Sequence, residues 1–118
     1  MANKANTLVT KTVEKTLPPL YSQKNKHNLT TAYVKFFNII NGWRYYAAEY
    51  DPKTGLAFGL IQNPTETELG YFNLNEMQEL NDKWKEKNLQ VPPFERDTNF
   101  KPTTIGVIKE RLKQGNPS

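Results

Sequence analysis

The stretch Trp43-Arg-Tyr-Tyr-Ala-Ala-Glu-Tyr50 decides how this sequence folds. It is dense in aromatic side chains, which favour the pleated, half-buried surface of a β-strand. Thr31-Ala-Tyr-Val-Lys-Phe-Phe37 has the same character, and Asn41-Gly42 between the two segments is a strong signal for a tight turn. The two segments are therefore predicted to form a β-hairpin.

Two further strands follow after short connections. Asp51-Pro-Lys-Thr-Gly55 predicts a turn, because the fixed φ of proline suits a type I turn and glycine accepts the positive φ that closes it. The turn leads into Leu56-Ala-Phe-Gly-Leu-Ile61, and Asn63-Pro64 then redirects the chain into Thr67-Glu-Leu-Gly-Tyr-Phe72. Short connections join antiparallel neighbours, so the four strands are predicted to form an antiparallel meander.

A short helix is predicted before these strands. The helix is expected over residues 10–17, because the apolar residues Val9, Val13 and Leu17 recur every four positions. Thr10 is a suitable N-cap, and Pro18-Pro19 ends the helix. Leu20 and Tyr21 are then expected to tuck beneath the core.

A second helix is predicted directly after the strands. Asn73 and Glu76 have the spacing of a capping box, which marks the start of a helix. The expected apolar face of this helix is made by Leu74, Met77, Leu80 and Trp84.

The chain is then predicted to run extended before a last helix. Residues 88–101 contain Pro92-Pro93, and their expected anchors in the core are Val91, Phe94 and Phe100. The last helix is expected over residues 103–113, with Pro102 suited to its first turn. The fold class is thus α+β: a four-stranded antiparallel meander with an N-terminal helix and two C-terminal helices.

Length and composition predict a single cytoplasmic domain over residues 1–118, frayed over 1–8 and 114–118. The sequence has no cysteine, which excludes disulfides, thiolate metal sites and cysteine nucleophiles. No stretch reaches the roughly 20 apolar residues of a membrane span, and the N-terminus lacks the apolar region of a signal peptide. We therefore expect no membrane contact.

The net charge of +4 comes from one end of the sequence, since residues 1–30 carry five lysines and one glutamate. Such a segment suits a solubilising surface better than a nucleic-acid arm. Among catalytic groups, the serines Ser22 and Ser118 and the single His27 lie in a predicted loop or tail, which argues against a nucleophile–base enzyme. The glycines match neither a P-loop nor a dinucleotide turn. No catalytic residue, metal ligand or cofactor is predicted.

Carboxylates give one candidate site. Glu49 and Asp51 lie at the end of the second predicted strand, and Glu66 and Glu68 lie at the start of the fourth. Glu95 and Asp97 flank Arg96 in the extended segment. If they converge at one sheet edge, they can bind Mg²⁺ or act as an acid–base pair. The alternative is a structural network in which Arg96 holds a carboxylate bidentately and pins the extended segment to the sheet.

Aromatic side chains give a second candidate site. Strand alternation predicts that Tyr33, Lys35 and Phe37 share one face. In the next strand, Trp43 and Tyr45 are predicted to lie on one face, and Arg44, Tyr46 and Tyr50 on the opposite face. An open aromatic face can stack single-stranded bases, form a protein-binding surface, or pack beneath residues 92–100.

Several motifs together resemble a bacterial domain-of-unknown-function family. The resemblance is carried by Leu17-Pro-Pro-Leu-Tyr-Ser-Gln23, Tyr33-Val-Lys-Phe-Phe37, Glu68-Leu-Gly-Tyr-Phe72, Glu95-Arg-Asp97 and Phe100-Lys-Pro102. It implies an origin in plasmids, conjugative elements and phages, whose small proteins often bind host machinery. It implies no activity and no residue role.

We therefore expect a non-enzymatic binding protein of a mobile element. Its partner is expected to be a host or element-encoded protein, and an inhibitor of CRISPR or restriction nucleases is one form. The alternative is a single-stranded nucleic-acid binder that uses Tyr33, Phe37, Arg44 and Tyr46. The residues expected to form the binding surface are Tyr33, Phe37, Trp43, Arg44, Tyr46, Glu49, Asp51, Glu68, Glu95, Arg96 and Asp97.

Overall fold

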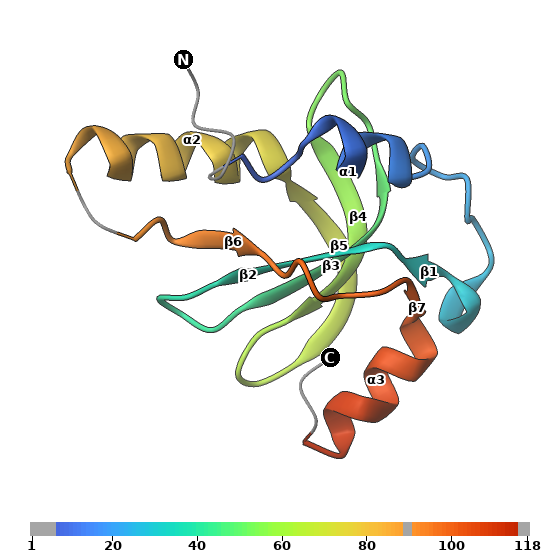
Figure 1. Cartoon of the computed structure of the whole chain (residues 1–118). Coiled ribbons are helices and arrows are strands. Elements are labelled where there is room, and N and C mark those ends of the chain that lie inside the picture. Colours follow the sequence, from blue (N-terminus) through green and yellow to red (C-terminus); the bar gives the residue numbers. More distant parts are fainter. Residues whose placement is uncertain (1–6, 89–90, 116–118) are drawn as a thin grey trace.

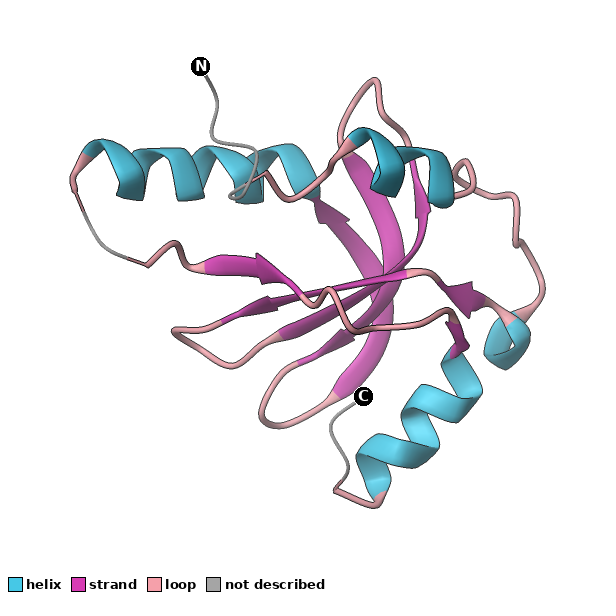
Figure 2. Cartoon of the chain, viewed as in Figure 1, coloured by secondary structure: helices cyan, strands magenta, loops and turns pink. Residues whose placement is uncertain are grey.

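A computed structural model of the chain describes residues 7–88 and 91–115. In chain order its elements are α1 (Lys11–Thr16), the 3₁₀ helix η2 (His27–Leu29), β1 (Thr31–Ala32), β2 (Val34–Asn38), β3 (Arg44–Tyr50), β4 (Leu56–Gln62), β5 (Thr67–Asn73), α2 (Leu74–Glu86), β6 (Phe94–Arg96), β7 (Thr103–Thr104) and α3 (Ile105–Lys113) (Figures 1 and 2). The α+β class with one N-terminal and two C-terminal α-helices is confirmed.

The main sheet has five antiparallel strands in the order β5-β4-β3-β2-β6, and β1 pairs with β7 in a separate two-stranded ribbon. The strands β2 to β5 follow one another as a meander, as predicted. The predicted four-stranded sheet is nevertheless incomplete, because β6 comes from the segment expected to be merely extended. It adds to the outer side of β2 through the pairing of Phe37 with Glu95.

Helices cover both faces of this sheet. α1 and α2 lie along one face and α3 lies against the other (Figure 1). Beneath α1 and α2 the core contains Phe36, Tyr45, Phe72, Leu74 and Met77, among others. Beneath α3 a smaller cluster contains Ala32, Tyr46, Leu60, Ile105 and Ile108.

A bulge in β3 changes which side chains share a face. The register runs from Ala47 opposite Gly59 to Glu49 opposite Phe58, so one residue is skipped. Tyr50 consequently points into the same core as Tyr45, and the prediction that it shares a face with Arg44 and Tyr46 is wrong. Glycine is required opposite this bulge because a Cβ on Gly59 would clash with the carbonyl oxygen of Tyr46.

The strand predicted over residues 31–37 is broken at Tyr33. Its first part is β1, which pairs with β7, whereas β2 begins at Val34. Tyr33 packs against the core beneath α1, so it does not share a face with Lys35 and Phe37. The predicted alternation fails here because the chain leaves one sheet and enters another.

The second helix begins as predicted, since the Asn73 side chain accepts hydrogen bonds from the N–H groups of Asn75 and Glu76. Its buried face differs from the prediction: Leu80 is 40% exposed, and Asn81 is buried instead. The Asn81 side chain accepts the N–H of Phe94 at 3.0 Å and donates to its carbonyl at 2.9 Å. These two bonds fasten β6 to α2.

Four smaller expectations are also corrected. Tyr21 and Val91 are exposed rather than anchored in the core. Pro102 precedes β7 and lies outside α3, whose N-cap is Thr104. Leu8 is buried in the core, although residues 1–8 were expected to fray. Residues 1–6 and 116–118, which share that expectation, lie outside the described residues.

Candidate functional site

The expected surface residues are divided between the two faces of the sheet. The strand registers place Phe37, Arg44, Tyr46 and Glu49 on the face of α3, together with Glu95 and Asp97. They place Glu68 and Arg96 on the face of α1 and α2, where Trp43 also packs against the core. Asp51 lies in the turn before β4 and Tyr33 in the break between β1 and β2. The set is therefore not one surface.

The carboxylates serve the fold at separate places. Glu49 is only 4% exposed, and it accepts the backbone N–H of Tyr21 at 2.7 Å and that of Gln23 at 2.8 Å. Asp51 accepts the N–H of Lys53 and the hydroxyl of Thr54, both at 3.0 Å, within its turn. Among the described residues, no three histidine, aspartate or glutamate side chains are grouped so that they could hold a metal ion.

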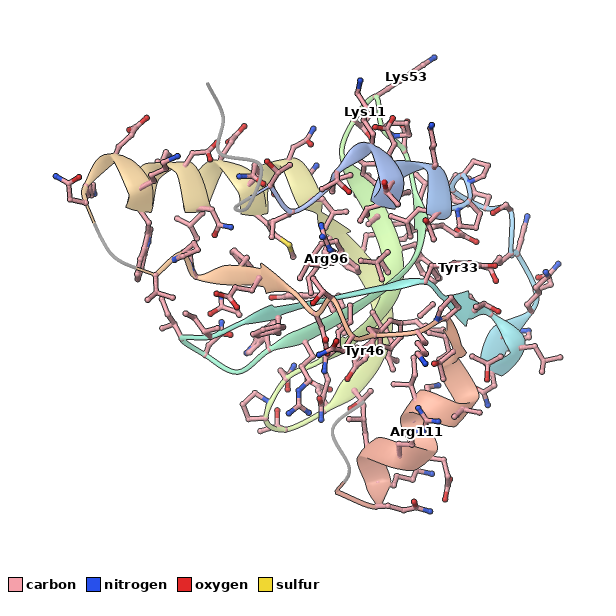
Figure 3. All side chains as sticks on the ribbon, viewed as in Figure 1. Lys11, Tyr33, Tyr46, Lys53, Arg96 and Arg111 are labelled. Atoms are coloured by element: carbon pink, nitrogen blue, oxygen red, sulfur yellow. The ribbon has the colours of Figure 1, made fainter. Side chains whose placement is uncertain are left out.

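Arg96 stabilises the fold in a different way from the one expected. Its Nη1 donates to the carbonyl of Leu8 at 3.1 Å, which ties the segment before α1 to β6. Arg96 lies on the α1 side of the sheet and Tyr46 on the α3 side (Figure 3). The described ion pair of this region joins Asp97 to Lys35 instead, with 3.5 Å between Nζ and Oδ2.

The aromatic residues of the α3 face do not form one exposed platform. Tyr46 is fully buried, with its ring centroid 5.8 Å from that of Phe100. Burial raises the pKa of Tyr46 to about 12, an effect that the nearby Arg44 guanidinium opposes. Phe37, which is half-buried, keeps part of its ring accessible beside Arg44.

A cleft of about 620 Å³ opens beside Phe37, and we name it the Arg44 cleft. Its lining residues are Lys35, Phe37, Asn38, Ile39, Gly42, Arg44, Arg96, Asp97 and Thr98. The guanidinium of Arg44 is held in place by a bond of 2.9 Å from Nη1 to Oε1 of Gln62. Lys35 is buried at the base of the cleft, and desolvation lowers its pKa, although Asp97 opposes this effect.

An exposed apolar strip lies on the same face at the opposite edge of the sheet. It consists of Tyr21, Phe58, Leu69 and Tyr71, and we name it the Tyr71 strip. Tyr21, Leu69 and Tyr71 are 63%, 39% and 50% exposed, and the rings of Phe58 and Tyr71 lie 5.0 Å apart. Partial desolvation, together with the neighbouring Tyr21 and then Glu49, raises the pKa of Tyr71.

The Tyr71 strip borders the open edge of β5, the terminal strand of the sheet. Glu66 accepts from Asn63, and Leu74 donates to Gly55, so the even-numbered residues direct their backbone groups toward β4. Backbone groups alternate along a strand. The N–H and C=O groups of Thr67, Leu69 and Tyr71 therefore point away from the sheet, whereas Asn73 is the N-cap of α2 and its C=O belongs to that helix.

The other edge of the sheet is blunted. β6 has three residues against seven in β5, and the outward N–H and C=O of Phe94 are both bonded by Asn81. Short edge strands and covered backbone groups prevent pairing with other chains, whereas a long open edge permits it. The two edges thus differ in their capacity to accept a further strand.

Sequence reasoning selected Glu68 on β5 but missed the Tyr71 strip. A signal existed in Glu68-Leu-Gly-Tyr71, where apolar side chains alternate with an acidic one on the last strand of a meander. Such alternation predicts a strand with one apolar face and one polar face. Its significance depended on knowing that no strand pairs with β5 on its far side.

These features define a small α+β protein whose sheet ends in an open edge strand beside an exposed apolar strip. Within the described residues, no helix has the length and apolar character needed to cross a membrane. The chain belongs to the family described as "Protein of unknown function (DUF2958)", whose model matches residues 8–108. The comparisons with curated proteins and with solved structures find no match.

Proposed function

We propose that this protein is a non-enzymatic binding protein that acts by protein–protein contact, and that its partner adds a strand to the outer edge of β5. The resemblance of its motifs to a family found in plasmids, conjugative elements and phages supports a mobile element as its source. An inhibitor of a host defence nuclease is the most specific form of this proposal.

The observation that carries the proposal is the open edge of β5. The outward N–H and C=O groups of Thr67, Leu69 and Tyr71 form a regular row, and no described strand pairs with it. An extended partner segment would satisfy these groups as a further strand does in known peptide-binding domains. Main-chain hydrogen bonds would then supply affinity, and side chains on the two faces would supply specificity.

The two faces at this edge indicate the chemistry of the partner segment. On the α3 face the edge presents the apolar side chains of Leu69 and Tyr71. On the opposite face it presents Glu68, with Glu66 just before the strand, and both are exposed. Cross-strand pairs of apolar residues and of opposite charges stabilise a sheet. The preferred segment therefore alternates apolar residues with lysine or arginine.

The same edge disfavours nucleic acid, because exposed Glu66 and Glu68 repel phosphates. The expected stacking surface for single-stranded bases also lacks support, since Tyr46 is buried and Tyr33 packs beneath α1. Protein contact is therefore the function that the geometry supports best.

A designed peptide tests this proposal. A short peptide of alternating valine and lysine should bind the protein in fluorescence anisotropy, and one of alternating valine and glutamate should not. Leu69→Lys places a charge in the apolar half of the edge and should weaken binding by about tenfold or more. Leu80→Lys is the matched control, because Leu80 on α2 is 40% exposed against 39% for Leu69.

The circular dichroism spectra of both variants establish that they are folded before binding is compared. Equal binding of the valine–lysine peptide by the two variants would contradict the proposal. So would equal binding of the two peptides by the unmodified protein.

A further inference from the structure

The Arg44 cleft has a charge imbalance that the strand-addition surface does not explain. Its base carries two cations, Lys35 and Arg44, and a single carboxylate, Asp97. Asp97 has a second interaction besides its ion pair with Lys35, since its Oδ1 accepts the N–H of Asn99 at 2.9 Å. One partly exposed carboxylate therefore faces two positive charges.

Neighbouring charged groups do not correct this imbalance. Although Arg96 lines the cleft, its Nη1 is bonded to the Leu8 carbonyl on the other side of the sheet (Figure 3). Glu95 is the cross-strand partner of Phe37 on this face, but it does not line the cleft and instead lines a separate pocket with Leu8 and Pro92. Among the described residues that line the cleft, Asp97 is the only acidic one.

The two cations are suited to different tasks. Lys35 is buried, with Nζ 3.5 Å from Asp97 and 5.7 Å from the ring centroid of Tyr46. Desolvation, with Arg44 adding to it, lowers its pKa, so a nearby anion would relieve an existing electrostatic cost. Arg44 is half-buried, and its guanidinium has five N–H donors, of which some remain for a ligand after those that bond to Gln62 and to Tyr46.

The walls of the cleft give it room for more than one small ion. Its volume of about 620 Å³ lies in the range of ligand pockets. Phe37 is half-buried and supplies a flat apolar wall directly beside Arg44, its cross-strand partner. A planar ring attached to an anion could therefore lie against Phe37 while the anion meets Arg44.

We propose that the Arg44 cleft binds a phosphate group, either free or carried on a nucleotide. Arg44 contacts the phosphate oxygens through its N–H donors, and Lys35 supplies a second positive charge from below. Phe37 packs against the base where there is one. The proposal is independent of strand addition at β5, which lies at the opposite edge of the sheet.

The test is a two-dimensional amide NMR titration at low ionic strength with three probes: inorganic phosphate, a nucleoside monophosphate and a short single-stranded oligonucleotide. Phosphate and the monophosphate should shift the amides of Lys35, Phe37, Gly42 and Arg44. Tighter binding of the monophosphate than of phosphate assigns the site to nucleotides, and equal binding assigns it to the free ion. Tighter binding of the oligonucleotide, centred on the same amides, assigns it to a nucleic-acid phosphate.

Arg44→Gln should weaken binding at least about tenfold, the loss of roughly one charge-assisted pair. Arg44→Lys keeps the charge without the planar donors and should give an intermediate loss; it serves as the second variant if Arg44→Gln does not fold. Arg111→Gln, at an exposed residue of α3, is the control that should change nothing (Figure 3). The proposal is overturned if phosphate and the monophosphate leave the cleft amides unshifted, or if the Arg44 and Arg111 variants lose affinity equally.

Discussion

Replacing Glu49 by glutamine tests whether this buried carboxylate stabilises the fold, as its contacts indicate. Each of its oxygens accepts one backbone N–H, from Tyr21 and from Gln23. A glutamine keeps one acceptor oxygen but turns an amide NH₂ toward the other N–H, which then loses its partner. Hydrogen bonds to charged groups contribute about 1.5–3 kcal/mol each, and a buried unsatisfied donor costs about 1–3 kcal/mol.

Glu49→Gln should therefore lower the free energy of unfolding by about 2–4 kcal/mol and Tm by about 10 °C. Urea denaturation followed by tryptophan fluorescence measures the change. Glu68→Gln is the matched control, because Glu68 is exposed on β5, and it should stay within about 0.5 kcal/mol of the unmodified protein. A loss below 0.5 kcal/mol (about the surface-substitution level) for Glu49→Gln would refute the reasoning and reopen a binding role for this carboxylate.

Three further predictions concern stability. Asn81→Leu removes both bonds to Phe94 and should cost about 3 kcal/mol or more in urea denaturation; a near-neutral result would mean that α2 does not hold β6. Gly59→Ala drives a Cβ into the Tyr46 carbonyl and should lower the free energy of unfolding by more than about 3 kcal/mol in the same measurement. Gly70→Ala is its control: the new Cβ meets only the Ile61 Cδ1 at 3.3 Å, and the loss should be less than about 1 kcal/mol. The pKa of Tyr46 is 10.0 when the chain is unfolded and about 12 when it is folded, so the free energy of unfolding should fall as pH rises from 10 to 12, by up to about 2.7 kcal/mol. Tyr46→Phe should remove that part of the dependence of stability on pH.

Local features of the fold could be predicted because their causes are local. Gly42 and Gly55 have φ of 78° and 81°, as their turns require, and both turns were identified from the residues within them. The N-caps Thr10 and Asn73 were identified for the same reason. In each case a few adjacent residues determine the backbone.

Other features depend on distant parts of the chain and were missed. The bulge that turns Tyr50 toward the core lies opposite Gly59, whose backbone approaches that of β3 so closely that a side chain would not fit. The strand β6 forms because β2 leaves an edge for it and Asn81 holds its other side. An isolated proline-rich segment carries no sign of either partner.

In the candidate site, too, some residues could be predicted from the sequence and others could not. Phe37, Arg44 and Asp97 were selected from the sequence and do meet in one cleft. The Tyr71 strip was missed because Leu69 and Tyr71 looked like ordinary strand residues. Only the order of the strands shows that β5 ends the sheet and leaves those side chains uncovered.

The most direct test of the central claim is amide hydrogen exchange of β5 with and without the valine–lysine peptide. Strand addition predicts that the N–H groups of Leu69 and Tyr71 exchange rapidly in the protein alone and become protected when the peptide binds. The N–H groups of Glu68 and Gly70, which point toward β4, should be protected in both states. If the peptide binds while Leu69 and Tyr71 continue to exchange rapidly, the partner is held elsewhere and the claim is wrong.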